Sequence, residues 1–152
     1  MERLRRRDYV IRGETPAQKN SQTFNARTRT MVKSPQFRRW RDSALMQIRA
    51  QGIPERPYPY AEIEILFVHS DLRRRDGDNQ LSSVQDLLVK AGVIGDDCWT
   101  RIGTPRVSHA VGKAARCEIR VFEVAPADWK SRIAEAKKCV KDVSSSSSLS
   151  AY

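Results

Sequence analysis

Hydrophobic and polar residues alternate most clearly over residues 60–69. The apolar side of this alternation holds Ile63, Ile65 and Phe67. The polar side begins with Glu62 and Glu64. A period of two residues is typical of a β-strand with one face on a hydrophobic core, so this segment is predicted to be a strand.

Two other segments repeat apolar residues every three or four positions, as helices do. The first starts at Ser34-Pro35, an N-cap followed by proline at the first helical position, and is predicted to end near Gly52. Its apolar residues are Phe37, Trp40, Ala44 and Ile48. The second starts at Asp78 and stops at Gly92. Its apolar residues are Leu81, Val84, Leu88 and Ala91.

Weaker patterns complete the order of elements. Strands are predicted at residues 9–12, 99–108 and 115–124, and a last helix at residues 126–140. The order β-α-β-α-β-β, followed by the C-terminal helix, indicates an α/β (α+β) fold in which helices pack on one mixed sheet. A single domain is expected over residues 1–142, with a disordered Ser-rich tail at residues 143–152.

Positive charge is concentrated in the first third of the chain. The 152 residues carry 28 Lys and Arg against 18 Asp and Glu, a net charge of +10. Residues 1–50 hold 13 basic and four acidic residues, a net charge of +9. Such a field attracts polyanions and makes nucleic acid the natural candidate partner, with plain solubility as the alternative.

Residues 13–34 show no periodicity and are rich in polar and basic side chains. A flexible basic loop is therefore expected there. Arg27, Arg29 and Lys33 suggest an arm that orders on a phosphate backbone, and simple disorder is the alternative.

The cysteines Cys98, Cys117 and Cys139 form no C-x-x-C pair, which fits a reducing compartment. No apolar signal sequence and no run of 18 apolar residues is present, so neither secretion nor membrane insertion is indicated. The expected location is the cytoplasm of a bacterial or phage-infected cell.

The most informative stretch for chemistry is Arg73-Arg74-Arg75-Asp76-Gly77-Asp78-Asn79, which joins a predicted strand to a predicted helix. In an extended chain Asp76 and Asp78 project to the same side. The helix and a short turn are expected to return the chain to Asp96 and Asp97, so that the acids converge at one sheet edge. Clustered carboxylates favour a cation among them, and Mg²⁺ or Mn²⁺ suits hard oxygen ligands.

With arginines beside it to hold phosphates, such an ion would activate water against a phosphodiester. The alternative is that Asp78 serves only as an N-cap and Gly77 only as a turn residue. A calcium-binding EF-hand loop is disfavoured, because Leu81 and Leu87 stand where that loop needs Gly and Glu.

The wider pattern around these acids resembles the RusA family of Holliday-junction resolvases. In that family an arginine-rich strand end runs into D-x-D-N, a helix carries D-A-L and ends at A-G, and a D-D pair opens the next strand. The matching stretches are Arg73–Asn79, Asp86-Leu87-Leu88, Lys90–Val93 and Asp96-Asp97. The predicted order of elements fits the family from about residue 8 to residue 124.

The resemblance implies a crossover junction endodeoxyribonuclease whose catalytic, metal-binding carboxylates are Asp76, Asp78 and Asp97. It also implies Mg²⁺ as the cofactor, a homodimer, and paired symmetric nicks in four-way junction DNA during recombination and repair. The nucleic-acid-binding residues would include Arg73, Arg74 and Arg75. No small-molecule substrate is implied, and Asp96 either assists the site or only caps the turn.

One position departs from the family, which usually has a lysine four residues into the helix after D-x-D. Ser82 occupies it here, and Arg75 or Arg101 is the expected source of the missing positive charge. If neither supplies it, turnover is reduced, or the chain is a catalytically weakened branched-DNA-binding protein. Two more functions fit the same residues: a nuclease for other branched or single-stranded nucleic acid, RNA included, and a basic scaffold whose acids are only caps.

The two histidines and Trp99 are left out of the predicted site, although histidine can bind metals and tryptophan can stack on bases. His69 and His109 are isolated in the sequence and fall near strand ends, so structural or solvent-exposed roles are expected for both. Trp99 is expected in the core rather than against unstacked bases.

Overall fold

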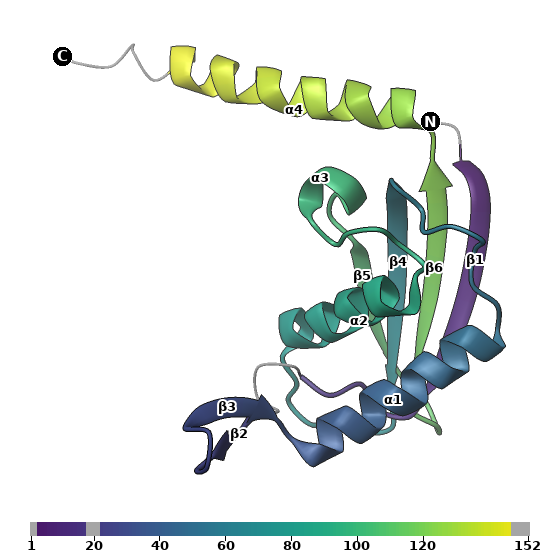
Figure 1. Ribbon diagram of the computed structural model, residues 1–152. Helices are drawn as coiled ribbons and strands as arrows, with labels where there is room; N and C mark the ends of the chain where they lie inside the picture. The colour runs from purple at the N-terminus through teal and green to yellow at the C-terminus, as the bar shows by residue number, and fades with distance from the viewer. Residues whose placement is uncertain (1–2, 18–21, 147–152) are drawn as a thin grey trace.

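A four-stranded sheet in the order β1-β6-β4-β5 forms the centre of the computed structural model (Figure 1). Its strands are β1 (Arg3–Arg12), β4 (Ala61–His69), β5 (Arg106–Val111) and β6 (Arg116–Val124). β4 and β5 are parallel, while β6 runs antiparallel to both β1 and β4. The sheet is therefore mixed, as the sequence predicts. The structure describes residues 3–17 and 22–146, with side chains through residue 138.

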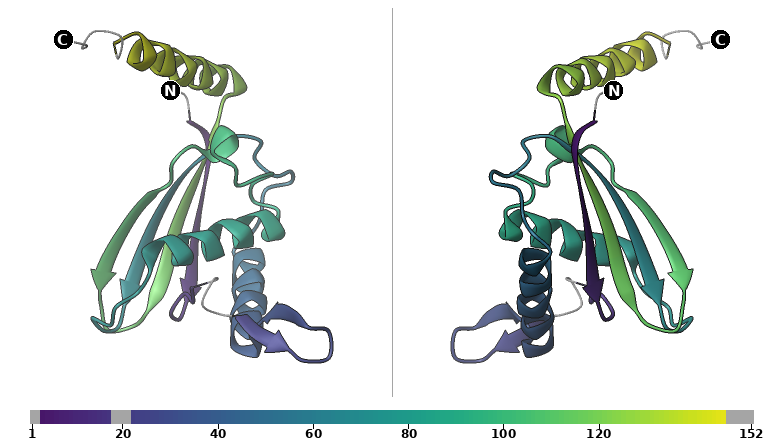
Figure 2. Two further views of the ribbon diagram at one scale, coloured as in Figure 1. Left: turned by 90° about the vertical axis from the view of Figure 1, so that its left-hand side faces the viewer. Right: turned by 90° about the vertical axis from the view of Figure 1, so that its right-hand side faces the viewer.

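Two helices lie on one side of this sheet, α1 (Pro35–Ala50) and α2 (Gly77–Ala91) (Figure 2). Ser34 starts α1, because its Oγ accepts a hydrogen bond from the Phe37 N–H at 3.1 Å. Gly92 ends α2 in the left-handed conformation, with φ at 80°. Local residue chemistry thus sets both boundaries close to the predicted ones.

The remaining elements lie outside the central sheet. A hairpin of β2 (Gln22–Asn25) and β3 (Thr30–Lys33) forms a second, two-stranded sheet. α3 (Trp99–Ile102) is a single turn before β5, and α4 (Pro126–Ser146) extends away from the sheet (Figure 1). The buried indole of Trp129 anchors the start of α4 by donating a hydrogen bond to the Thr100 carbonyl.

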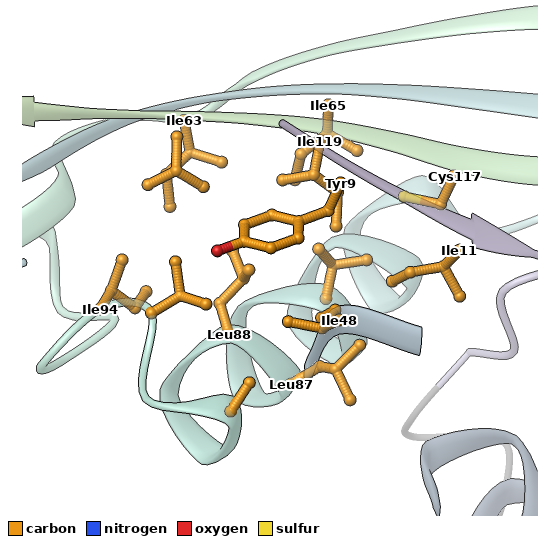
Figure 3. Packing of buried hydrophobic residues seen from close by; sticks show 14 of the residues in the cluster. Tyr9, Ile11, Ile48, Ile63, Ile65, Leu87, Leu88, Ile94, Cys117 and Ile119 are labelled. Carbon is orange, nitrogen blue, oxygen red and sulfur yellow. The ribbon is translucent and has the colours of Figure 1, made fainter. Parts of the chain in front are cut away.

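One hydrophobic core lies between the sheet and the two helices (Figure 3). The sheet contributes Tyr9, Ile11, Ile63, Ile65, Cys117 and Ile119, and the helices contribute Ile48, Leu87 and Leu88. Truncating the fully buried Leu88 to alanine would cost about 2–5 kcal/mol. Burial also raises the pKa of the Cys117 thiol to about 12, so this cysteine stays neutral at physiological pH.

Within residues 13–34, where the sequence predicts a flexible loop and no strand, the structure has the two strands of this hairpin. The turn between its strands is held by Asn25, whose Oδ1 accepts hydrogen bonds from the N–H groups of Arg27 and Thr28 at 3.0 and 3.3 Å. The two strands have no buried residue and therefore no hydrophobic pattern, and these hydrogen bonds in the turn help to hold the hairpin. Residues 18–21 of the predicted loop lie outside the described part of the chain.

Two further boundaries differ from the predictions. Residues 99–108, expected to be one strand, divide into α3 and the start of β5, because Gly103 ends the short helix with a positive φ of 62°. Trp99 is 62% exposed rather than in the core. α4 continues through Ser146 into the expected tail, and residues 147–152 are not described.

Candidate active site

The loop between β4 and α2 places two of the three predicted acids at the amino end of α2. Asp76 is the N-cap, and its carboxylate accepts hydrogen bonds from the Asn79 backbone N–H at 3.4 Å and from Asn79 Nδ2 at 2.5 Å. Asp78 lies in the first turn of the helix. Both residues are exposed, and acids at this position interact favourably with the positive end of the helix dipole.

A surface hollow of about 620 Å³ opens at these acids. It is lined by Arg74, Arg75, Asp76, Gly77 and Asp78. Arginine binds phosphate oxygens, and carboxylate oxygens suit a hard divalent cation that keeps several of its own waters. The hollow therefore combines groups for a phosphate with groups for a metal ion.

The three arginines of the loop have different surroundings. Arg75 is mostly buried, with its Nε 3.0 Å from Glu14 Oε1 and its Nη2 2.7 Å from Asp71 Oδ1. Arg73 is exposed, and its Nε lies 3.4 Å from Asp71 Oδ2. Hydrogen bonds from the Arg73 backbone N–H and the Arg75 side chain lower the pKa of Asp71. Arg75 therefore shapes the loop, while Arg74 is exposed in the hollow.

The third predicted acid, Asp97, lies at the opposite end of α2. Asp76 follows the carboxyl end of β4, whereas Asp97 precedes the amino end of the parallel strand β5. The 15 residues of α2 span roughly 22 Å between them at 1.5 Å per residue. Hydrogen bonds on both sides of Tyr58 hold the loop that follows the helix. Within one chain, the structure thus brings Asp76 and Asp78 together but not Asp97.

Among the described residues, no three His, Cys, Asp or Glu side chains form a group that could hold a metal ion. Asp96, beside Asp97, caps the turn before α3. Its Oδ1 accepts a hydrogen bond from the Cys98 N–H at 3.0 Å, and this bond lowers the pKa of the Asp96 carboxyl. Of the two roles expected for Asp96, the structure gives it the cap.

The two arginines expected to replace the family lysine are both engaged elsewhere. Arg75 forms ion pairs with Glu14 and Asp71. The Arg101 guanidinium lies over the Tyr60 ring, 5.0 Å from its centroid, in α3. Ser82 itself donates a hydrogen bond from its Oγ to the Asp78 carbonyl at 3.0 Å. The lysine position therefore contributes no charge to the hollow.

The two histidines form a hydrogen-bonded pair beside the hollow, although nothing in the sequence connects them. His69 Nε2 lies 3.0 Å from His109 Nδ1, and His69 Nδ1 lies 2.7 Å from Glu14 Oε1. Both histidines, with Arg75 and Gly77, line a cavity of about 320 Å³. Only the pairing of β4 with β5 brings them together, so sequence reasoning missed them.

The β2–β3 hairpin lies outside the central sheet and leads directly into α1. Phe24 and Met31 are partners across the hairpin and are 64% and 58% exposed. Arg27 and Arg29 lie in its turn. The segment that leads to the hairpin is fixed to α2, because the buried Gln80 side chain donates a 2.7 Å hydrogen bond to one of its carbonyls. An apolar pair and two positive charges are therefore exposed on the hairpin.

Part of the positive charge of the first third is neutralised within the chain. Arg3 pairs with Glu62 and Arg6 with Asp8, at N–O distances of 3.1 and 2.6 Å. The arginines of β1 therefore add less to the outward positive field than their number suggests.

No protein-family model matches the chain. Over 82 residues it is 28% identical to the crossover junction endodeoxyribonuclease RusA of Aquifex aeolicus (strain VF5). The matched segment covers 54% of this chain and 65% of that enzyme's length. The similarity is distant and partial. In the described residues, no helix is long and apolar enough to cross a membrane.

Proposed function

We propose that this chain is a divalent-metal-dependent, structure-selective endonuclease that resolves four-way DNA junctions by paired symmetric nicks, in recombination and repair. The observation that carries the proposal is the exposed pair Asp76 and Asp78, which share one hollow with Arg74. The similarity to a crossover junction endodeoxyribonuclease and the net charge of +10 support it.

Asp76 and Asp78 are the residues that would hold Mg²⁺, with Mn²⁺ as the alternative ion. Their donor set fits, since two exposed carboxylates leave coordination positions open for water and for phosphate oxygens. When bound, such an ion supplies an activated water and neutralises charge on the phosphate. Arg74 in the hollow and the exposed Arg73 would hold the phosphates of the strand, with Arg75 fixing the loop that carries them.

Asp97 would complete the carboxylate set from the partner subunit of a homodimer. Because α2 separates Asp97 from Asp76 and Asp78 within one chain, a second copy is the simplest source of the third acid. Two-fold symmetry would build the site twice, with each subunit giving its Asp97 to the other. Two equivalent sites suit a four-way junction, in which two strands of like polarity are cut.

The β2–β3 hairpin would contact the DNA near its branch point. The exposed Phe24 and Met31 offer apolar surface on which an unstacked base can lie, and Arg27 and Arg29 offer charge for the adjoining phosphates. Such contacts would favour branched DNA, because bases in a continuous duplex stay stacked.

A panel of labelled substrates tests the proposal. Four-way, flap, linear-duplex, single-stranded and RNA substrates would be incubated with the chain, in Mg²⁺ and in EDTA. We expect cleavage of the four-way junction in Mg²⁺ but not in EDTA, at symmetric positions on two strands. Faster cleavage of flap, single-stranded or RNA substrates would instead assign the other nuclease class. Tight, salt-sensitive binding with no cleavage of any substrate would indicate a junction-binding protein.

A further inference from the structure

Three side chains from three separate segments form a continuous hydrogen-bonded series beside the acids. Glu14 follows β1, His69 ends β4, and His109 lies in β5. Their distances are 2.7 Å from Glu14 Oε1 to His69 Nδ1 and 3.0 Å from His69 Nε2 to His109 Nδ1. The two imidazole planes are inclined by 14°, and their ring centroids are 5.3 Å apart. The series therefore runs from a carboxylate through two imidazoles.

The inner members of the series are held firmly. His69 is 8% exposed. Glu14 Oε1 also accepts a hydrogen bond from Gln80 Nε2 at 3.3 Å and forms an ion pair with Arg75 Nε at 3.0 Å. An ionised carboxylate can only accept hydrogen bonds, so these contacts fix Glu14 as the acceptor at one end of the series. His109, at the other end, is exposed.

The acceptor end decides which ring nitrogens carry protons when both imidazoles are neutral. Because Glu14 accepts, His69 Nδ1 must donate to it, and His69 Nε2 is left with a lone pair. That lone pair accepts the N–H of His109 Nδ1. His109 Nε2 therefore carries a lone pair and can accept a proton. The groups around this nitrogen decide which molecule can donate that proton.

His109 Nε2 faces the turn that carries the two acids. A Cβ atom built on Gly77 would lie 3.3 Å from this nitrogen, closer than side chains normally approach. Gly77 thus leaves room for the imidazole beside the turn that carries Asp76 and Asp78. Arg75 and Gly77 line both the histidine cavity and the hollow at the acids, so the two spaces adjoin. The other charged residues at the histidine cavity are Asp71 and Arg73.

We infer that His109 is a catalytic proton acceptor for phosphodiester hydrolysis, with His69 and Glu14 as its positioning residues. This inference rests on the proposed nuclease function. The oxygen of a water molecule bonds to the scissile phosphorus, and a proton of that water passes to His109 Nε2. The bond from phosphorus to the leaving sugar oxygen breaks, and that oxygen takes a proton from solvent. His109 then returns its proton to solvent.

The proton positions are tested first, on the wild-type chain without metal or DNA. The sequence has two histidines, so their ¹⁵N resonances can be assigned with single variants. We expect neutral His69 and His109 to carry their protons on Nδ1, and Glu14→Gln to weaken that preference. A neutral His109 that carries its proton on Nε2 would overturn the inference, whatever the outcome of any cleavage assay.

Junction cleavage then tests the catalytic role. His109→Gln should lower the single-turnover rate by about 10²-fold, within the range of general-base catalysis, while the Kd for the junction changes less than about threefold. It should also flatten the pH profile of the cleavage rate, because the proton acceptor is lost. His69→Gln should give a smaller rate loss with the same flattening. The matched control is Val107→Gln, two residues earlier on β5 and outside the cavity, which should cleave at the wild-type rate.

The results separate this inference from the proposed function. If the wild-type chain cleaves the junction and His109→Gln cleaves it equally fast with the same pH profile, the catalytic role of His109 is wrong and the nuclease function stands. If the wild-type chain cleaves no nucleic acid while the NMR pattern is found, the nuclease function is wrong and the catalytic role falls with it. Equal rate losses in His109→Gln and Val107→Gln would show that β5 itself was disturbed and would contradict a specific role.

Discussion

The two ends of α2 differ in how their polar residues are held. At the amino end, the capping carboxylate of Asp76 lies beside an interlocked network that includes Glu14, His69 and Arg75. At the carboxyl end, the chain first buries Val93 and Ile94 in the core, and acids follow only in the next turn. A β-α-β crossover must place the two ends of its helix at opposite ends of the parallel strands. Residues that form one sequence motif can therefore lie far apart in the fold.

The largest expected effect tests whether the carboxyl end belongs to the same site as the amino end. Asp97→Asn should lower junction cleavage by on the order of 10³-fold, because a lost metal ligand removes several kcal/mol of transition-state stabilisation. The matched control is Asp96→Asn, since asparagine can still cap the turn to Cys98 and should cleave within about threefold of wild type. If Asp97→Asn also cleaved within about threefold of the wild-type rate, the site would lie at the amino end alone.

Mixed dimers test whether two chains join the two ends. A dimer of one Asp78→Asn subunit and one Asp97→Asn subunit, purified through two different affinity tags, should contain one intact site. We expect about half the wild-type rate and a single nick per binding event, far above either variant alone. Mixed dimers as inactive as both parents would place all three acids in one chain and refute the shared site.

Variants of the β2–β3 hairpin test whether this hairpin, and not only the two ends of α2, contacts the branch point. Phe24→Ala should weaken binding to a four-way junction about tenfold, as loss of one stacked base predicts, with little change on linear duplex. Thr23→Ala, at the next position of the same strand, is the control and should bind as wild type does. An equal loss on junction and duplex would show that the hairpin does not recognise branching.

Restoring a lysine tests how much charge the amino end lacks. Ser82→Lys should raise the cleavage rate roughly fivefold, because Arg75 is engaged by acids while Arg74 already supplies one cation. Ser82→Gln lengthens the side chain without charge and should leave the rate unchanged. A gain above about 100-fold would show that Arg74 does not compensate for the missing lysine.

The smallest expected effect concerns the stability of the loop at the amino end. Hydrogen bonds from Arg73 and Arg75 lower the pKa of Asp71, so ionised Asp71 stabilises the folded chain above its unfolded pKa. That contribution is lost as the pH falls through the lower folded value. Asp71→Asn should therefore have a slightly lower Tm at pH 7, and the difference should shrink as the pH falls below about 4 and vanish below the folded pKa of Asp71. A Tm difference that persists at acidic pH would assign the effect to something other than this charge.

The elements that sequence predicted well are those whose pattern is local. The strand at Ala61–His69 and the helices at Pro35–Ala50 and Gly77–Ala91 carry clear periodicity and capping residues. The hairpin carries neither, because its side chains are largely exposed and its turn is held by Asn25. A strand with no buried face leaves little hydrophobic pattern to detect.

The candidate site was predictable only in part, for a related reason. Asp76 and Asp78 are close in sequence, and their shared position follows from the strand-to-helix junction itself. Glu14, His69 and His109 come together only through the pairing of strands, which no local pattern specifies. The sequence pattern predicts that Asp97 meets the other acids at one sheet edge. Because β5 runs parallel to β4, Asp97 precedes β5 at the opposite edge instead.

Mapping of nicks on a synthetic four-way junction tests the central claim most directly, with wild type and Asp78→Asn compared in Mg²⁺ and in EDTA. We expect two symmetric nicks by wild type in Mg²⁺, none in EDTA, and none by Asp78→Asn, which should still bind the junction. Cleavage that proceeds in EDTA, or that Asp78→Asn carries out at the wild-type rate, would contradict a metal-dependent nuclease built on these acids.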